Sequence, residues 1–241
     1  MTSPGESFPG GTSVSLLDVY ADEASDGVCG GSPHMHLVST ECYIVTSGEG
    51  ALQTIDGTGF RETALRAGSV VWFTPGTIHR AVNRGDLRVV VLMGNAGLPE
   101  AGDAVLTFPA EIVEDAEAYA RAATLSPADD LVARAESARA RRDLAVNGFL
   151  TLRKSVEAGD AEGLHAFHAA ARALVQNRAA TWPDIVRAGP LRQAEASLAF
   201  AEAVSRGEAE HLSDARLFAA PAPEGDRGFG MCGRLTTFDL R

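Results

Sequence analysis

The chain has 241 residues, which is enough for one large domain or two small ones. Hydrophobic residues make up 45% of it, a proportion that is ordinary for a globular protein with a sizeable core. The 32 acidic residues outnumber the 21 basic ones and give a formal net charge of −11, which argues against binding to nucleic acid or to an anionic membrane surface. No apolar run reaches about 18 residues, and the N-terminus lacks the basic and apolar parts of a signal peptide. We therefore expect no membrane span and a cytoplasmic protein.

The first half of the chain predicts short strands separated by turns. Residues 1–11 are rich in Pro, Gly and Ser and predict a lead-in segment, and residues 13–20 predict the first strand. Short strands at regular spacing, with Gly-bearing turns between them, are typical of an all-β barrel. The other predicted strands are 40–46, 51–55, 60–65, 70–73 and 87–93, with turns at 47–50, 56–57 and 83–86.

Four side chains in this half predict a metal site. His34 and His36 lie two residues apart on one predicted strand, so both point to the same face. Glu41 opens the next strand, and His79 follows a turn at residues 74–78. Imidazole nitrogens with a carboxylate suit iron, manganese, nickel, copper or zinc better than calcium.

The spacing of these residues resembles the two motifs of the cupin superfamily, over roughly residues 12–95. One departure is the turn Thr74-Pro75-Gly76, where the family usually has Pro-x-Gly. The resemblance implies a small antiparallel barrel, the cupin double-stranded β-helix, with the metal held inside by His34, His36, Glu41 and His79. The residues that match are Gly31, His34, His36, Glu41 and Gly48 in the first motif, and Gly68, Pro75, Gly76, His79 and Asn83 in the second.

Glu41 and Tyr43 are the candidate catalytic residues. They share one face of their strand, so Tyr43 is expected to point into the barrel beside the metal; the alternative is a core tyrosine with its hydroxyl satisfied. A carboxylate that loosens from the metal could also make Glu41 a base. Of Trp72 and Phe73, one must face inward. The three cysteines, Cys29, Cys42 and Cys232, are too few and too irregular for a disulfide framework, and Cys42 is expected to face outward.

From residue 110 the composition shifts to Ala, Glu and Arg, which predicts helices. A helical segment is expected at 111–123, and a long helix capped by Ser126 is expected to end at Gly159. Arg142 interrupts its apolar stripe and is interpreted as a paired or snorkelling side chain, or alternatively an anion contact. In the next helix, from about residue 160, His168 is interpreted as a satisfied boundary residue rather than a ligand.

The remaining chain predicts a break at Trp182-Pro183, helices at 190–205 and 208–218, and a loop at 219–228. The tail at 229–240 predicts a strand that either returns to the barrel or crosses to a partner subunit. The predicted organisation is a β barrel followed by an α-helical region, with boundaries at 1–109, 110–228 and 229–241.

A six-coordinate metal with four protein ligands keeps two adjacent positions for substrate and for O₂ or water. The first hypothesis is an Fe(II)-dependent oxygenase, dioxygenase-like, acting on a small organic molecule. The second is a non-redox metalloenzyme, an isomerase, epimerase or lyase, with zinc, manganese or nickel. The third is a non-catalytic small-molecule-binding protein. The expected cofactor is a divalent metal ion, iron first, with Mn, Ni, Zn or Cu as alternatives. The expected partners are a small-molecule substrate and a second copy in a homodimer.

Overall fold

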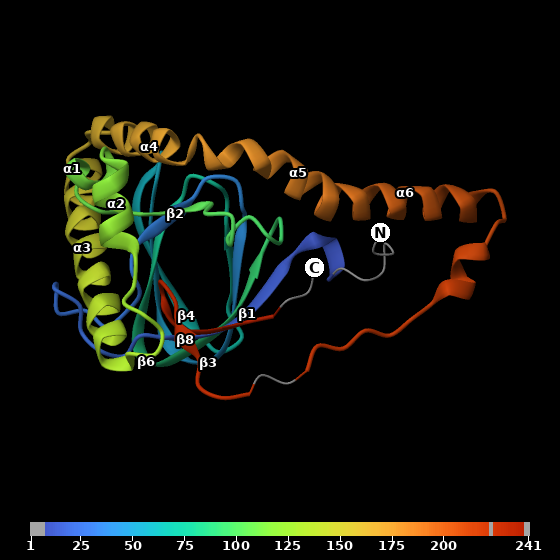
Figure 1. Ribbon diagram of the computed structural model, residues 1–241, viewed down its shortest axis with the longest axis horizontal. Helices are drawn as coiled ribbons and strands as arrows, with labels where there is room; N and C mark the ends of the chain where they lie inside the picture. Colours follow the sequence, from blue (N-terminus) through green and yellow to red (C-terminus); the bar gives the residue numbers. More distant parts are fainter. Residues whose placement is uncertain (1–7, 222–223, 239–241) are drawn as a thin grey trace.

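The computed structural model describes residues 8–221 and 224–238. A β barrel forms the centre, a layer of helices covers one side of it, and a long arm leaves the barrel and returns (Figure 1). The strands are β1 (Ser13–Val19), β2 (His34–His36), β3 (Glu41–Asp56), β4 (Gly59–Arg66), β5 (Val70–Phe73), β6 (Ile78–Met93), β7 (Ala104–Leu106), β8 (Gly228–Phe229) and β9 (Gly233–Thr237).

The helical elements follow the barrel strands, except for one short turn near the N-terminus. The α-helices are α1 (Ala110–Val113), α2 (Ala116–Ala123), α3 (Leu131–Glu157), α4 (Glu162–Val175), α5 (Trp182–Val186) and α6 (Arg192–Ser205). The shorter turns are the 3₁₀ helices η1 (Pro9–Gly11), η2 (Arg178–Thr181) and η4 (Glu210–Asp214), and the π-helical turn η3 (Arg187–Leu191).

All strand pairs are antiparallel, and two long strands form the centre of the sheet. β3 and β6 have 16 residues each and pair with each other along most of their length. β4 and β5 pair with β3, β1 pairs with β6, and β9 adds to the far edge of β1. β2 lies between β6 and β7. The predicted β barrel followed by a helical region is confirmed, and β7 is a strand that the sequence did not predict.

The turns predicted at 47–50 and 83–86 are wrong, because the two long strands run through both places as a paired bulge. The register between β3 and β6 shifts between Val45 and Gly50. Gly48 has a φ of 75°, and a Cβ there would lie 2.2 Å from the carbonyl oxygen of Asp86. Glycine is needed here because only hydrogen lets the two backbones approach this closely.

Asn83, a residue of the second motif, holds the β6 side of this bulge. Its side-chain oxygen accepts hydrogen bonds from the backbone N–H groups of Gly85 and Leu87, and its amide donates to the carbonyl of Val19 at 2.8 Å. The side chain thus satisfies backbone groups that the bulge removes from the ladder. Its role in this motif is structural.

The helices α1 to α4 pack against the barrel through one hydrophobic cluster. Met35 of β2 and Leu106 of β7 contribute from the barrel, and Phe149 of α3 and Phe167 of α4 from the helices. α3 is capped by Asp130, whose carboxylate accepts from the N–H of Ala133, so the predicted cap at Ser126 is wrong. Ser126 lies before the helix, and its backbone hydrogen-bonds with two side chains of α3. The two bonds run from the Ser126 N–H to Ser137 Oγ and from the Arg134 guanidinium to the Ser126 carbonyl.

Arg142 on α3 is a paired arginine, as the sequence analysis interpreted it. Arg142 is 1% exposed. Its guanidinium donates hydrogen bonds to the carboxylate of Asp22, at 2.7 Å, and to the carbonyls of Gly30 and Glu23. The pair ties the long loop before β2 to the helical layer.

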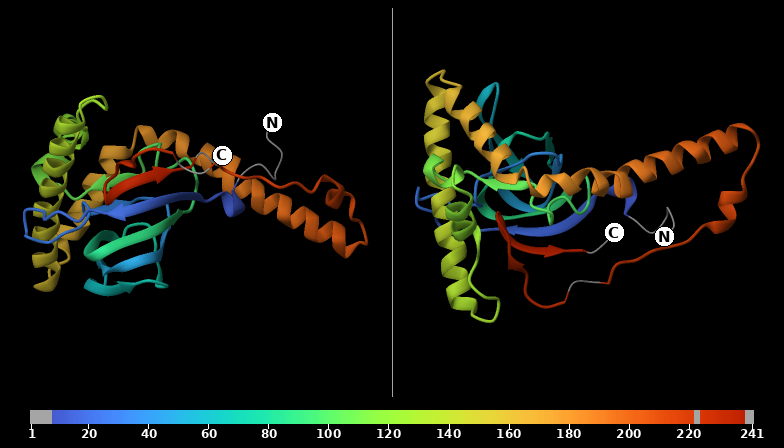
Figure 2. Two further views of the ribbon diagram at one scale, coloured as in Figure 1. Left: turned by 90° about the horizontal axis from the view of Figure 1, so that it is seen from below. Right: turned by 45° about the horizontal axis from the view of Figure 1, so that its top comes forward.

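Beyond α4, the chain forms the arm, which we define as residues 182–221 and 224–227. Its start packs on the barrel, because Trp182 is buried in the cluster shared with the helices. Figure 2 shows that α6 projects away from the barrel in both views. Trp182-Pro183 does not break the helical path, because the proline occupies the first turn of α5, where no backbone N–H is needed. The helix predicted at 208–218 is wrong; only the 3₁₀ turn η4 forms there.

The chain then returns to the barrel. β9 pairs with β1 of the same chain, with Ser15 opposite Thr237, and β8 pairs with β9. Within the described residues, the predicted tail strand therefore takes the returning path rather than the crossing one. The predicted strand extends to 240, and residues 239–241 lie outside the described residues.

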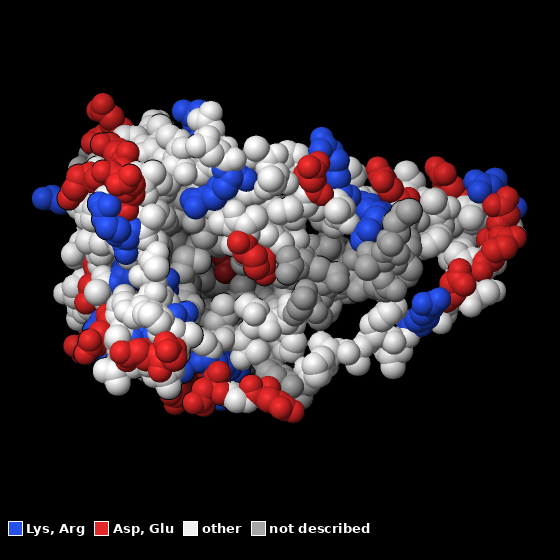
Figure 3. Space-filling model, viewed as in Figure 1, with Lys and Arg blue, Asp and Glu red and all other residues white. Residues whose placement is uncertain are grey.

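Two features of the surface bear on the expected partners. In the part of the chain that the structure describes, no helix combines the length and hydropathy needed to cross a membrane. On the face drawn in Figure 3, acidic and basic side chains are interspersed and no continuous basic stripe forms.

Candidate metal centre

The four predicted ligands come from three neighbouring strands. β2 is buried along its whole length, with Met35 in the cluster shared with the helices and its two histidines on the opposite, inner face. His34 lies directly opposite His79 in the β2–β6 ladder. Glu41 opens β3, opposite Phe73 of β5 and Met93 of β6. The strand register alone therefore gathers residues that are up to 45 positions apart in the sequence.

The ligand atoms converge inside the barrel. One atom from each of His34, His36, Glu41 and His79 lies within 4.8 Å of the others, and all four side chains are buried. Glu41 Oε2 is 3.2 Å from His36 Nε2 and 3.1 Å from His79 Nε2. The structure brings together all four residues that the sequence singled out.

Hydrogen bonds from Nδ1 orient the rings of His34 and His79, and an ion-pair contact with Asp103 orients that of His36. Nδ1 of His34 donates to the carbonyl of Ser32 at 3.0 Å, and Nδ1 of His79 donates to the carbonyl of Thr77 at 3.2 Å. Nδ1 of His36 is 3.5 Å from Oδ2 of Asp103. These contacts leave Nε2 as the ligand atom of each ring, which is the usual arrangement around a protein-bound metal.

The donor set fits a transition-metal ion. His79 Nε2 and Glu41 Oε2 are buried and contact each other as an ion pair at 3.1 Å, but neither makes a hydrogen bond of good geometry to a described residue. Such a contact satisfies buried polar groups only in part, and coordination of an ion would satisfy both. Three imidazole nitrogens and one carboxylate oxygen are the ligands that iron, manganese, nickel, copper and zinc accept. The geometry and the donor set support the predicted divalent-metal site.

The titratable groups of the centre are strongly coupled. Burial lowers the pKa of His34 well below its usual range. Burial also lowers the pKa of His36, but the carboxylates of Asp103 and Glu41 outweigh it and raise that pKa to about 9. For Glu41, burial raises the pKa, and the facing imidazoles of His79 and His36 outweigh it and hold it well below the usual value. The ion-free site thus keeps Glu41 ionised, the form that binds a metal.

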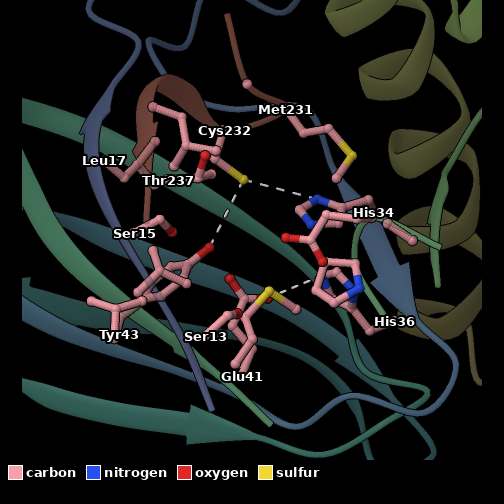
Figure 4. A pocket seen from close by; sticks show the side chains of 18 of the residues that line it. Ser13, Ser15, Leu17, His34, His36, Glu41, Tyr43, Met231, Cys232 and Thr237 are labelled. Atoms are coloured by element: carbon pink, nitrogen blue, oxygen red, sulfur yellow. Dashed lines mark hydrogen bonds and ion pairs between the residues drawn. The ribbon is translucent and has the colours of Figure 1, made fainter. Parts of the chain in front are cut away.

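A cavity of about 130 Å³ opens in front of these ligands. Tyr43 lines it and is fully buried, so it points into the barrel as the sequence predicted. Its hydroxyl lies 3.8 Å from the thiol of Cys232, which in turn lies 3.9 Å from Nδ1 of His34 (Figure 4). Burial raises the pKa of Cys232 to about 12 and that of Tyr43 well above its usual value, so both groups keep their protons.

An aromatic side chain of β5 packs against one of the ligands. The ring of Phe73 lies 4.3 Å from that of His79, measured between centroids, whereas Trp72 is 70% exposed. The inward-facing member of this pair is therefore Phe73. Cys42 is half-buried on the other face of β3 and is not among the residues that line the cavity.

Sequence reasoning missed Asp103 and the C-terminal residues Met231 and Cys232. Asp103 accepts hydrogen bonds from the backbone N–H groups of residues 37, 38 and 39 and so fixes the chain between His36 and Glu41. Burial raises its pKa, but these bonds and His36 outweigh it and lower the pKa to about 2. Met231 and Cys232 lie about 190 residues from the ligands in sequence, and no spacing pattern links them.

The helical layer also supports the centre. His168 of α4 bonds the carbonyl of Gly76 through Nε2 at 3.1 Å, and the N–H of Gly76 donates to the carbonyl of His36. Gly76 belongs to the turn that leads into His79. The interpretation of His168 as a satisfied boundary residue is confirmed, and its partner is the turn that presents a ligand.

Comparison with known proteins agrees with this geometry. Residues 25–94 match the family model of the cupin domain. A search of the curated proteins found no match.

Several solved structures are similar to part of this chain. WlaRA (TDP-fucose-3,4-ketoisomerase) from Campylobacter jejuni is 13% identical with a TM-score of 0.32, and the match covers 38% of this chain and 64% of that chain. Streptomyces PAC13 with uridine is 18% identical with a TM-score of 0.31, over 44% of this chain and 69% of that one. An uncharacterized double-stranded β-helix protein from Klebsiella pneumoniae is 23% identical with a TM-score of 0.28, over 40% and 85%.

The family match covers the strands that carry the centre, and both predicted motifs lie on those strands with their ligands converging. The barrel of this chain is therefore a cupin domain.

Proposed function

We propose that the chain is a metal-dependent enzyme, an Fe(II)-dependent oxygenase that acts on a small organic molecule. The observation that carries the proposal is the buried set of three imidazoles and one carboxylate facing a cavity in the barrel. Four protein ligands leave room at the metal for both an organic ligand and a second small molecule. Bound Fe(II) would activate O₂, and the organic substrate would supply the electrons that the incorporation of oxygen consumes.

Residues of the chain would bind the ion, position its ligands and contact the substrate. His34, His36, Glu41 and His79 would hold the ion, and Asp103 would keep the His36 ring in place. The Tyr43 hydroxyl would donate a hydrogen bond to the substrate. The apolar wall, which includes Leu17, Val91 and Met231, would exclude bulk water from the reacting groups.

The alternative is a non-redox metalloenzyme, an isomerase, epimerase or lyase. The observation that favours it is the Tyr43 hydroxyl, a protonated group that lines the same cavity and could act as a general acid. In that case zinc, manganese or nickel would polarise a carbonyl or hydroxyl of the substrate.

Purification without air, followed by metal analysis and O₂ uptake with candidate substrates, tests these proposals. Iron with substrate-dependent uptake supports the oxygenase. Zinc, manganese or nickel with turnover and no uptake supports the alternative, and binding without turnover would leave the chain as a small-molecule-binding protein.

Two histidine variants make the test sharper. His79→Ala removes a ligand and is expected to weaken metal binding by roughly 100-fold or more, beyond the 10- to 100-fold typical of residues behind the ligands. His165→Ala is the matched control, because that histidine is exposed on α4 and lies outside the metal centre. Equal metal binding by both variants and the unmodified protein would contradict the site. Thermal unfolding of each ion-free variant shows whether it folds.

A further inference from the structure

The walls of the cavity in front of the metal ligands come from both ends of the chain. β1 supplies Ser13, Ser15 and Leu17, and the C-terminal hairpin of β8 and β9 supplies Met231 and Thr237. We propose that the substrate is a small uncharged molecule, with an enclosed part about the size of one six-membered ring, that carries hydroxyl or carbonyl oxygens. This inference rests on the proposed metal-dependent function and specifies its substrate class.

The size of the cavity sets the first limit. Its volume is about 130 Å³. An apolar protein cavity of about 150 Å³ holds one benzene molecule. The enclosed part of the substrate therefore has the bulk of one small ring or of a short chain.

The charges around the cavity set the second limit. No Lys or Arg occurs among the described residues that line it. The lining carboxylates are Glu41, which belongs to the metal centre, and Glu100, which is exposed. A carboxylate or phosphate group on the substrate, away from the metal, would be removed from water without a cationic partner. This loss of hydration would weaken the binding of the charged compound.

Hydroxyl groups that line the cavity can recognise an uncharged substrate through hydrogen bonds. Ser13, Ser15 and Leu17 alternate along β1 on its inner face, and Thr237 lies opposite Ser15 in the β1–β9 ladder. No hydrogen bond joins the hydroxyl of Ser13, Ser15 or Thr237 to another described residue. Each hydroxyl can donate one hydrogen bond and accept others, so the three groups match hydroxyl or carbonyl oxygens of an uncharged ligand.

A matched pair of probes tests the charge assignment. Catechol has the size of one ring and two neighbouring oxygens, and protocatechuate is the same molecule with a carboxylate added. Titration calorimetry would measure both on the zinc-loaded full chain, so binding is read without turnover. We expect catechol to bind roughly tenfold more tightly or better, because the added carboxylate meets no cation.

Two substitutions sharpen this test. Ser15→Ala is expected to weaken catechol binding by about two- to tenfold, the effect of one lost hydrogen bond. Ser205→Ala on α6, far from the cavity, is the matched control and is expected to bind catechol unchanged. Thr237→Arg places a cation at the cavity and is expected to improve protocatechuate binding relative to catechol.

The outcomes separate the two proposals. Failure to bind zinc overturns the metal centre and the substrate class together. Zinc binding with protocatechuate at least as tight as catechol overturns the substrate class alone. Tighter binding of dopamine, a cationic catechol, would do the same, because it would make Glu100 a recognition group.

Discussion

The helical layer and the arm have similar Ala-rich sequences but opposite relations to the barrel. α3 and α4 bury Phe149, Leu164 and Phe167 against strands β2 and β7. α6 buries no residue at all, although it has the same length as α4. The arm exposes several large apolar side chains, namely Leu191, Leu198, Phe200, Val204, Leu212, Leu217 and Phe218. Helix-forming composition therefore does not predict packing, which depends on whether a complementary surface lies within reach.

The largest expected contrast between the two regions comes from two glycines. A Cβ at Gly148 in α3 would lie 2.1 Å from the carbonyl oxygen of Thr107, so the helix could not stay in place against β7. Gly148→Ala is expected to lower the free energy of unfolding by roughly 3 kcal/mol, the upper range for overpacking. Gly189 in the arm has no atom near its Cβ position, and Gly189→Ala is expected to change stability by no more than about 1 kcal/mol. Urea unfolding of both variants measures the difference, and equal effects would contradict the close contact.

The second prediction concerns how the barrel holds its ligands. Asp103→Asn keeps the shape of the side chain but removes the charge that His36 and three backbone N–H groups share. We expect metal affinity to fall by roughly 10- to 100-fold, the usual effect of losing a partner behind a ligand. Competition with a chelator measures the affinity. Asp184→Asn in the arm, which removes an exposed pair with Arg187, is the control and is expected to leave it unchanged. An unaltered affinity in Asp103→Asn would show that His36 needs no such support.

The third prediction uses pH to test how the loop before β2 is fixed. The hydrogen bond from Arg142 lowers the pKa of Asp22. For Asp26, burial raises the pKa, but the hydrogen bond and charge of Arg80 outweigh it and the pKa is lowered. A carboxylate whose pKa is lower in the folded state stabilises the fold above its ordinary value, here 3.8, and loses that contribution as the pH falls.

Stability of the ion-free protein is therefore expected to fall as the pH drops through this range. The double variant Asp22→Asn and Asp26→Asn is expected to be less stable near neutral pH and to show a flatter acid limb. Urea midpoints measured across the acid range test this. Parallel curves for the variant and the unmodified protein would mean that the two pairs contribute nothing to the pH dependence.

The smallest expected effect on stability comes from the surface of the arm. Leu198→Glu changes a side chain that is 61% exposed, so the free energy of unfolding of the single chain should change by less than about 0.5 kcal/mol. The same variant tests the homodimer predicted from the sequence. Light scattering on this variant and on Trp72→Glu, which alters an exposed barrel residue, would show whether either surface is needed for association. A single chain of 25.2 kDa in the unmodified protein would contradict the homodimer prediction.

The sequence by itself determined which four residues form the candidate metal centre, because the alternation of a strand converts spacing into direction. His34 and His36 had to share a face, and the barrel register then brought His79 and Glu41 to them. Likewise, Arg142 and His168 stood out from the stripes of their helices, and polar groups in such positions need partners.

Only the tertiary structure decided what surrounds that centre. Asp103 and Cys232 reach it through loops and through a hairpin that returns after the arm, and the position of such segments follows from the packing of the whole chain rather than from local pattern. The same holds for the bulge that replaced two predicted turns, since its geometry depends on Gly48 meeting Asp86 across the sheet. Local sequence specifies direction along an element, whereas contacts between distant segments depend on the free energy of packing them together.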